Sequence, residues 1–539
     1  MAIIDSRIDP NSESFKRNRA DMLALIDGFR ALEQRVRDTS NAKLPVFQKR
    51  GQLTPRQRLA HLLDRGAPWL EISTLCGLNM HDDDGAENIM GGGFIAGIGF
   101  VSGIRCLVTA SDSGIKGGTI APMGLRKSLR AQNIALQNKL PVVNLVESGG
   151  ANLNYQADIF VDGGRGFANQ ARLSAAGIPQ VTIVHGSSTA GGAYIPGMSD
   201  YVVVVKNRAK IFLAGPPLLK SATGEIATDE ELGGADLHAT VSGVAEYLAE
   251  DDADAIRIGR EIMARLPWNQ RLPPRLVKSW REPRYTADEL CGVVPTDYRK
   301  PYDVREVIAR LVDDSDFTDF KPLYGTHTVC GQASIEGEAV GLIGNNGPID
   351  PQGAVKAAQF IQLCDQADMP IVFLQNTTGY MVGKEAERGG IVKHGSKMIQ
   401  AVTNARVPKL TLHIGASFGA GNYGMCGRSY DPRFIFAWPN NRIAVMGPEQ
   451  AAGVLAIVAE EKFRRAGAEP DAAMLDGMKA KVTAKMEKES TALFATARMW
   501  DDGLIDPRDS RRLLADCLAM TREADLRTPK ANAFGIARM

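Results

Sequence analysis

The strongest constraint in this sequence is a pattern that occurs twice. Each copy contains apolar runs that begin at or beside a proline, followed by a glycine-rich segment that ends in tyrosine. This segment is Gly186–Tyr194 in the first copy and Gly415–Tyr423 in the second, and corresponding residues lie 229 positions apart. A repeat distance this long indicates a duplicated domain and not a solenoid array. We therefore expect an α/β protein of two tandem domains related by internal duplication.

The glycine-rich segment has the composition of a turn between a strand and a helix. The apolar run 178–184 before it is typical of a buried strand, and small residues follow it. A helix that begins at such a turn points unpaired backbone N–H groups at one place. Because the turn has no Lys or Arg, these amides would stabilise a negative charge by themselves, as in an oxyanion hole. The alternative is a structural turn, but its recurrence favours a functional role.

Alternating strands and helices surround both copies. Thr54 and Pro55 have the residue types of an N-cap and a first helical position. Residues 268–301 are rich in proline and arginine and indicate an interdomain connection, so we expect domains at 1–285 and 286–539. The other expected elements are helices at 14–40, 125–137 and 165–175, and a hairpin formed by 91–100 and 104–110.

Composition excludes several classes of function. The net charge of +1 provides no basic field for nucleic acid. No window approaches about 18 uninterrupted apolar residues, so we expect no membrane span. The first residues lack a secretory pattern, so we expect a cytoplasmic protein. The seven cysteines form no CxxC pair and the seven histidines no HExxH motif, so we expect no metal in this chain.

Six segments of this sequence carry a resemblance: Glu147–Asn152, Thr189–Tyr194, Phe212–Pro217, Gly233–His238, Ser417–Gly427 and Trp438–Asn440. Together they resemble one family, the carboxyltransferase (β) subunits of biotin-dependent acyl-CoA carboxylases, which are ligases. The resemblance implies two crotonase-like domains of the ClpP/crotonase spiral type. It further implies a homo-hexameric β core in an α6β6 complex, with the active site between the N-terminal domain of one subunit and the C-terminal domain of another. Because the chain shows no ATP-binding glycine loop and no biotin-attachment Met-Lys-Met, biotin and ATP chemistry are expected on an α partner.

The same resemblance assigns roles to residues. The amides of Gly191 and Gly192 are expected to hold the thioester oxygen of acyl-CoA, and those of Ala420 and Gly421 the ureido oxygen of carboxybiotin. No protein base is then needed, since the biotin nitrogen left after release of CO2 takes the substrate proton. Further expected contacts are Gly149, Gly150 and Lys116 for acyl-CoA, and Phe418, Gly419, Asn422 and Tyr423 for biotin.

Other charged residues near the expected site have weaker assignments. Lys127 and Arg130 are further candidates for the CoA phosphates, with a solvated helix face as the alternative. For His185 and His413, which precede the two turns, a structural role is favoured over a catalytic one.

The segment Gly421–Gly427 resembles the branch that acts on β-methyl-branched enoyl-CoA thioesters. Two acyl groups fit this branch, 3-methylcrotonyl and the longer geranyl, and pocket volume should discriminate between them. Geranyl-CoA is favoured, because small residues stand where the 3-methylcrotonyl enzymes tend to have larger ones; loop drift without effect on the pocket is the alternative. These residues are Gly163, Gly164, Gly166, Ala168 and Gly197.

Two other functions remain open from the sequence. A biotin-dependent acyl-CoA decarboxylase would run the same transfer in reverse and would need a membrane-embedded partner. A CoA-binding scaffold without catalysis is the other reading, although it gives no purpose to two glycine-rich turns.

Overall fold

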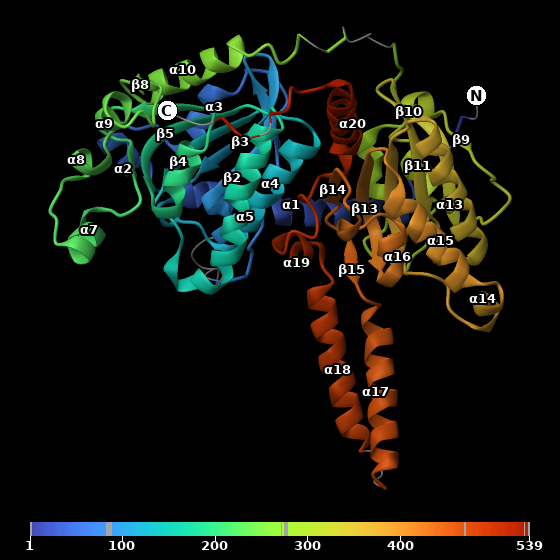
Figure 1. The fold of residues 1–539 in the computed structure, drawn as a ribbon. Coiled ribbons are helices and arrows are strands. Elements are labelled where there is room, and N and C mark those ends of the chain that lie inside the picture. The colour runs from blue at the N-terminus through green and yellow to red at the C-terminus, as the bar shows by residue number, and fades with distance from the viewer. Residues whose placement is uncertain are drawn as a thin grey trace. The chain divides into compact units, whose positions relative to one another are not determined.

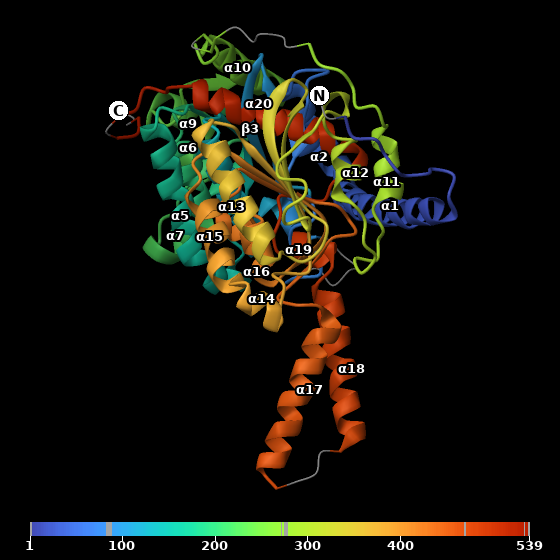
Figure 2. The same cartoon turned by 90° about the vertical axis from the view of Figure 1, so that its right-hand side faces the viewer.

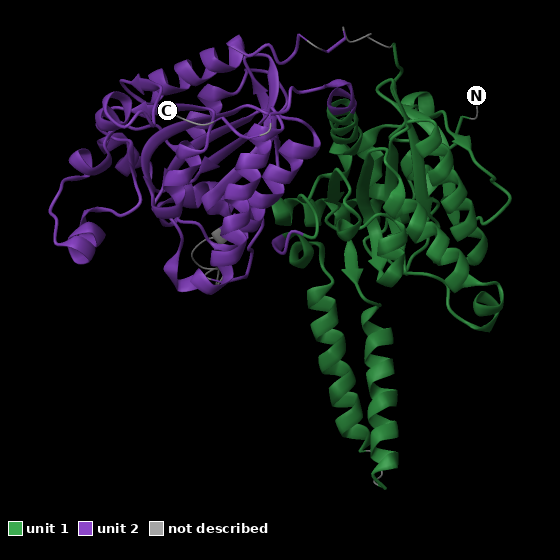
Figure 3. Ribbon diagram, viewed as in Figure 1, with its two compact units in different colours: residues 1–30, 276–496, 500–521 green, residues 31–275, 497–499, 522–539 purple. Residues whose placement is uncertain are grey.

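The computed structural model describes residues 3–81, 89–270, 272–273, 279–467, 471–532 and 534–536. The chain folds into two compact units (Figure 3). Unit 1 consists of residues 1–30, 276–496 and 500–521, and unit 2 of residues 31–275, 497–499 and 522–539.

Unit 2 is built on an eight-stranded sheet of order β1-β2-β3-β4-β5-β6-β8, with β7 paired to β5 beyond the end of β6. The pairs β1–β2 and β2–β3 are antiparallel, and the strands from β3 onward are parallel. The strands are β1 (Leu70–Glu71), β2 (Phe94–Val101), β3 (Ile104–Ser111), β4 (Val142–Ser148), β5 (Gln180–Thr189), β6 (Tyr201–Val205), β7 (Lys210–Phe212) and β8 (Tyr247–Ala249).

Unit 1 contains a seven-stranded sheet of order β14-β13-β12-β11-β10-β9, with β15 paired to β13. Its strands are β9 (Thr318–Asp319), β10 (Thr328–Ile335), β11 (Glu338–Asn345), β12 (Ile371–Thr377), β13 (Lys409–Phe418), β14 (Phe434–Ala437) and β15 (Arg442–Ala444). Each sheet thus has an antiparallel hairpin followed by parallel strands in the same order. The strand pairs β4/β12 and β5/β13 lie at the sequence offset that the repeat predicts.

Helices cover both sheets. In unit 2, α3 and α10 pack on the strands through buried aliphatic residues such as Leu59, Ile183 and Ile256. In unit 1, α13 and α15 lie side by side on the second sheet, where Phe373 is fully buried (Figures 1 and 2). A long antiparallel hairpin of α17 and α18 projects from unit 1 (Figures 1 and 2). No helix in the described ranges has the length and hydropathy needed to cross a bilayer.

The first ten helices are α1 (Glu13–Asn41), α2 (Leu44–Lys49), α3 (Pro55–Leu62), α4 (Pro122–Gln137), α5 (Gln156–Ala175), α6 (Tyr194–Gly197), α7 (Pro216–Thr223), α8 (Asp229–Gly233), α9 (Ala235–Thr240) and α10 (Asp252–Arg265). The others are α11 (Leu290–Val293), α12 (Val304–Ile308), α13 (Pro351–Gln366), α14 (Lys384–Arg388), α15 (Ile391–Asn404), α16 (Gly419–Gly424), α17 (Pro448–Arg465), α18 (Ala472–Glu489), α19 (Ala492–Ala497) and α20 (Ser510–Leu526).

Two aspartates fix the hairpins of the two sheets in the same way. Asp64 accepts hydrogen bonds from the backbone N–H groups of Ser102 and Gly103 at the β2–β3 turn, and Asp313 accepts from those of Glu336 and Gly337 at the β10–β11 turn. Each carboxylate thus accepts two backbone N–H groups of a tight turn. This matching contact is a second structural correspondence between the two units, besides their shared strand order.

Several local predictions are confirmed. Thr54 caps α3 in a capping box with Gln57, and Pro55 is the first helical residue. The predicted hairpin forms, with its turn at Ser102. The helix expected at 165–175 begins earlier, at Gln156, so the small residues before 170 lie in a helix and not in a loop.

The region 268–301 is only partly a connection. The boundary between unit 2 and the main segment of unit 1 falls inside this region, between residues 275 and 276. Residues 274–278 themselves lie outside the described residues. Residues 287–293 form short helical segments, and Leu290 and Val293 are buried in unit 1. Residues 1–30 belong to unit 1, together with the later part of the chain, and residues 522–539 belong to unit 2, together with the earlier part. The predicted division into 1–285 and 286–539 does not contain this exchange of chain ends, and it stays a prediction.

Candidate functional site

The first glycine-rich turn follows β5 directly. Ala190 adopts a left-handed conformation with φ of 53°, and the 3₁₀ helix η4 (Ala190–Ala193) begins there. The buried Ser188 hydroxyl donates a hydrogen bond to the Gly192 carbonyl at 2.9 Å. The Gly191 N–H lies at the second helical position, before the first intrahelical hydrogen bond. The turn therefore presents an amide donor at the carboxyl end of the sheet.

The segment after β4 approaches the same turn. Gly150 has φ of 91°, and a Cβ at this position would lie 3.3 Å from the Thr189 carbonyl oxygen. A side chain here would meet both backbone strain and crowding. The structure thus brings Gly150 next to the turn that contains Gly191, as predicted for two parts of one site.

The second turn has the same backbone geometry with different side chains. Gly419, the counterpart of Ala190, has φ of 55°. A Cβ on Gly419 would lie 3.0 Å from the Val445 carbonyl oxygen, which explains why the second copy has glycine at this position. The amides of Gly419, Ala420 and Gly421 are the first three of α16 and have no acceptor within that helix.

Side-chain contacts behind the second turn hold its backbone in place. The Ser417 hydroxyl donates to Gln375 Oε1 at 2.5 Å, and Asn422 Nδ2 donates to Ser417 Oγ at 2.7 Å. Phe418 is buried and packs edge-to-face against Tyr298, with ring centroids 5.2 Å apart. Of the residues predicted to contact biotin, Asn422 and Phe418 thus direct their side chains into the protein, while Tyr423 is 46 % exposed.

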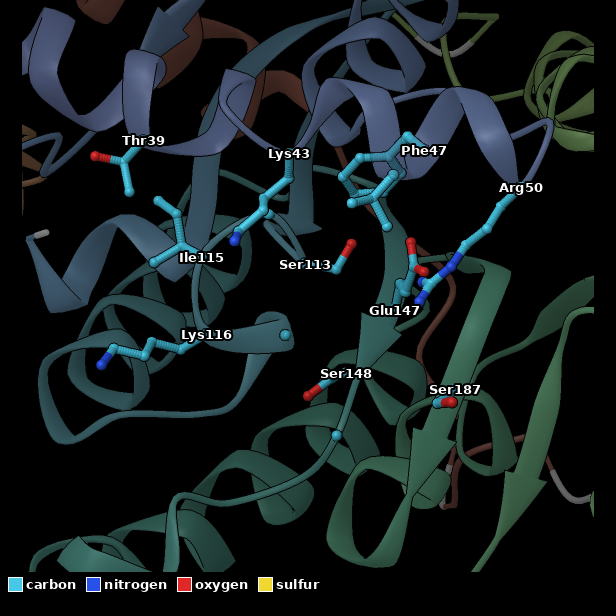
Figure 4. A pocket seen from close by; sticks show the side chains of 14 residues that line it. Thr39, Lys43, Phe47, Arg50, Ser113, Ile115, Lys116, Glu147, Ser148 and Ser187 are labelled. Atoms are coloured by element: carbon cyan, nitrogen blue, oxygen red, sulfur yellow. The ribbon is translucent and has the colours of Figure 1, made fainter. Parts of the chain in front are cut away.

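A cavity of about 680 Å³ lies beside the first turn (Figure 4). Its lining includes Thr39 from α1, Phe47 from α2 and the two residues that flank α2, Lys43 and Arg50; the loop after β3 contributes Lys116. Lys43 and Arg50 make no ion pair among the described residues, so the cavity lining has unneutralised positive charge. The sequence prediction contained Lys116 but missed Lys43 and Arg50, although the cluster of basic residues at 43–50 was a signal for them.

The one carboxylate in the lining is already paired. Glu147 Oε2 accepts from Arg58 Nη1 at 2.5 Å, and Arg58 Nε contacts Asp252 Oδ2 at 3.2 Å. Asp252 Oδ1 lies 2.8 Å from Nδ1 of the buried His185. Burial and the Arg58 charge lower the pKa of His185, so its imidazole is neutral. Burial opposes ionisation of Asp252, but the hydrogen bond with His185 and the charge of Arg58 bring its pKa to about 2.

This buried series of contacts, from Glu147 through Arg58 and Asp252 to His185, gives His185 a structural partner. It favours the structural role expected for His185. It also holds Glu147, through its ion pair with Arg58, at the edge of the cavity. Net positive charge in the lining therefore comes from Lys43 and Arg50, the two residues that flank α2.

Lys127 does not lie on a solvated helix face. Its side chain is 1 % exposed inside unit 2, where burial lowers its pKa. The corresponding Lys356 is fully buried too, and its Nζ donates to the Tyr324 carbonyl at 3.0 Å. The interpretation of Lys127 as a solvated residue is wrong, and its burial equally separates it from a phosphate site.

The small residues expected around the acyl group differ in their surroundings. A Cβ on Gly164 would meet no atom within 4 Å, and one on Gly163 only Ile159 Cγ2 at 4.0 Å. A Cβ on Gly197, at the end of α6, would also meet open space. These three positions leave volume near the first turn.

Gly166 and Ala168 lie elsewhere on α5. Gly166 faces α4, since its Cβ position is 4.0 Å from Leu129 Cδ2 and its carbonyl accepts a hydrogen bond from Gln132 Nε2. Ala168 is half-buried. The segment therefore divides into a face with open glycines and a face that packs against its own unit.

Comparison with known proteins decides the family. A model of the carboxyl transferase domain matches residues 47–534. The chain belongs to the carboxyl transferase family. It is a β-type subunit of the biotin-dependent acyl-CoA carboxylases, as its resemblance implied.

Three relatives illustrate the range of this family. The β2 subunit of a probable biotin-dependent acyl-coenzyme A carboxylase from Mycobacterium tuberculosis is 48 % identical over the full length of both chains. The mitochondrial methylcrotonoyl-CoA carboxylase β chain of Dictyostelium discoideum is 48 % identical over 100 % of this chain and 91 % of its own. The crystal structure of the P. aeruginosa geranyl-CoA carboxylase β subunit matches with a TM-score of 0.94 and 62 % identity over 100 % of both chains.

Unit 1 of this carboxyltransferase contains a buried polar cluster behind the second turn. Neither ring nitrogen of the buried His413 has a hydrogen-bond partner, and burial with the charge of Arg428 lowers its pKa to about 3. Arg428 pairs with Asp502 at 2.7 Å. Within the described ranges, no group of three or more His, Cys, Asp or Glu could hold a metal ion.

Asp501 provides a test of this cluster. Its Oδ1 accepts from the Gly503 N–H at 3.0 Å, its Oδ2 has no partner, and burial raises its pKa to about 7. A carboxyl whose pKa is raised by folding stabilises the protein fully below its unfolded pKa of about 3.9, and this contribution is lost as pH rises through about 7.

We therefore expect Asp501→Asn, which keeps the acceptor for Gly503, to gain stability relative to the wild type as pH rises from 5 to 8. Thermal unfolding midpoints of both proteins across this range measure the difference. A difference in unfolding midpoint that is constant with pH would contradict the raised pKa of Asp501. Any contribution from His413 is the same in both proteins and cancels from the difference.

Proposed function

We propose that this chain is the carboxyltransferase subunit that transfers CO2 from carboxybiotin to the β-methyl carbon of geranyl-CoA. The observation that carries this proposal is the 62 % identity, over the whole of both chains, with the geranyl-CoA carboxylase β subunit. The open space at Gly163, Gly164 and Gly197 supports it, because a longer acyl group needs volume near the first turn.

The amides of the two turns carry the chemistry of this chain. Those of Gly191 and Gly192 hold the thioester oxygen, where negative charge develops when the γ-proton leaves through the conjugated double bond. Such donors contribute roughly 3 to 4 kcal/mol each in a dry site. Gly149 and Gly150 bring the backbone after β4 to the same oxygen.

The second turn serves the biotin side. The amides of Ala420 and Gly421 bind the ureido oxygen, with Gly419 allowing the turn, Phe418 and Asn422 fixing it and Tyr423 bordering it. These donors fit a carbonyl-type oxygen, because all three first amides of α16 lack an acceptor within the helix. When bound, carboxybiotin supplies CO2 and a ureido nitrogen able to take the substrate proton. No histidine competes for this role at the first turn, since His185 is buried against Asp252.

The positive cavity is the place for the phosphates of coenzyme A. Lys43, Arg50 and Lys116 line it, and Gly149 and Ser187 connect its wall to the first turn. Cationic side chains around a cavity of this size suit a multiply charged anion.

We also infer the assembly from the family. The chain forms a homo-hexameric core and binds a biotin-carrying α subunit as α6β6, with acyl-CoA and biotin sites from two different copies. The shared strand order and the matched aspartates at the hairpins support an origin of the two units by internal duplication of a crotonase-like domain. The second candidate function is 3-methylcrotonyl-CoA carboxylation, which the relative from Dictyostelium discoideum favours.

Substrate range tests the proposal directly. We expect the chain, mixed with its biotin-bearing partner and ATP, to carboxylate geranyl-CoA with a higher kcat/KM than 3-methylcrotonyl-CoA. Incorporation of labelled bicarbonate into each acyl-CoA measures both. Efficient carboxylation of 3-methylcrotonyl-CoA with none of geranyl-CoA would refute the proposal and establish the second candidate.

Gly192 tests the first turn. The position has room, because its Cβ would lie 3.9 Å from the nearest atom, Ser188 Oγ. We expect Gly192→Val to fold and assemble but to lose at least about 100-fold in turnover, since the branched side chain blocks approach to the amides. Gly477→Val, at an equally open glycine on α18, is the matched control and should keep its activity. Full turnover in Gly192→Val would contradict the oxyanion assignment.

Arg50 tests the phosphate site. We expect Arg50→Gln to raise KM about tenfold for every acyl-CoA, with kcat unchanged, because the lost contact is to the common CoA portion. The effect should shrink at high salt. Lys49→Gln, next to it on the exposed helix end, should change KM little. An effect on one acyl chain length only would contradict this placement.

A further inference from the structure

The face of α5 that adjoins the first turn has an unusual order of side chains. Phe160, Gly164 and Phe167 recur at spacings of four and three residues and share one helical face, with Gly163 beside them. An apolar stripe of this kind on a helix usually packs against the core. Here Phe160 is 82 % exposed, and a Cβ on Gly164 would meet no atom within 4 Å.

One end of this stripe lies at the glycine-rich turn. The Phe167 ring is 3.4 Å from the Cβ position of Gly191 and packs against the Tyr194 ring, with centroids 5.6 Å apart. The near end is therefore an aromatic wall that stands against an amide predicted to hold the thioester oxygen.

The other end lies beyond the reach of a short acyl group. From Phe167 to Phe160 the helix rises about 10 Å, at 1.5 Å per residue. The glycines between the two aromatic rings leave a gap in the side-chain surface along this distance. A chain that starts at the turn and follows the helix would pass over Gly164 and reach the exposed ring of Phe160.

From these observations, which rest on the proposed function, we infer that the Phe160–Gly164–Phe167 face of α5 is a track for the acyl chain. The Phe160 ring binds its terminal, methyl-branched end. The occupant is the hydrocarbon part of a long branched enoyl-CoA, because the track is apolar, begins at the thioester site and is longer than a short branched acyl group. Phe160 is then a residue that determines chain-length specificity by contact, whereas the glycines act by leaving room.

Phe160→Ala in the complete complex with the biotin-bearing partner tests the track. We expect KM for geranyl-CoA to rise about tenfold with kcat little changed, since a contact with an unreactive part of the substrate is lost. 3-Methylcrotonyl-CoA, measured as substrate or as competitive inhibitor, should bind as to the wild type, because its acyl group does not reach Phe160. Phe160→Leu, which keeps an apolar side chain, should recover most of the affinity.

Val161→Ala is the matched control. Val161 is 80 % exposed on the same helix but points about 100° away from Phe160. We expect it to leave the KM of both acyl-CoAs unchanged.

The possible outcomes separate the track from the proposed function. An unchanged KM for geranyl-CoA in Phe160→Ala overturns the track while geranyl-CoA carboxylation stands. Equal loss with both acyl-CoAs, together with a changed molecular mass of the complex, assigns Phe160 to a contact between copies and also overturns the track. Failure of the wild-type complex to carboxylate geranyl-CoA refutes the proposed function before any variant is compared.

Discussion

Each unit of this protein turns a buried strand into a helix at a single left-handed residue. Ala190 and Gly419 hold this conformation, and without it the chain would continue in the extended form, with its amides pointing alternately to the two sides of the strand. A non-glycine residue in this region is strained by roughly 1 to 2 kcal/mol, which surrounding contacts must offset. The hydrogen bond of Ser188 to Gly192 in the first turn, and the Ser417–Gln375–Asn422 contacts in the second, fix the two turns. The positions of the amides in both turns depend on these two left-handed residues.

The two turns share a backbone but differ in what surrounds them. The first is open, as Gly192 has room for a side chain, and a positive cavity lies beside it. The second is tight, because a Cβ on Gly421 would lie 2.8 Å from Gly379 Cα. A turn that must accommodate different acyl groups can use such space, whereas a turn that binds one cofactor headgroup can be rigid. The two units thus present similar strand–turn–helix segments in different surroundings.

Charge is arranged to leave the first site positive. The only carboxylate at the cavity edge, Glu147, is held by Arg58, which is itself fixed by Asp252 and His185 inside the unit. A buried ion pair of this kind adds little net stability, because desolvation offsets the attraction. Its consequence here is local: Glu147 already has Arg58 as its ion-pair partner, while Lys43 and Arg50 make no ion pair among the described residues.

The sequence by itself determined the repeat, the strand–turn–helix segments and the capped helix at Thr54, because these depend on residues that are neighbours along the chain. It also led to the family, since the motifs around both turns are local. Tertiary structure decided the rest. Lys43 and Arg50 join Lys116 only because α1 and α2 fold over the carboxyl end of the sheet, and Lys127 is buried only because α4 packs with that face inward. The sequence identified the glycines near 164 only as small residues. Their place on a helix, between two aromatic rings, became clear only because α5 begins at Gln156. Contacts between segments far apart in sequence leave no local pattern, so no reading of periodicity could have placed these side chains.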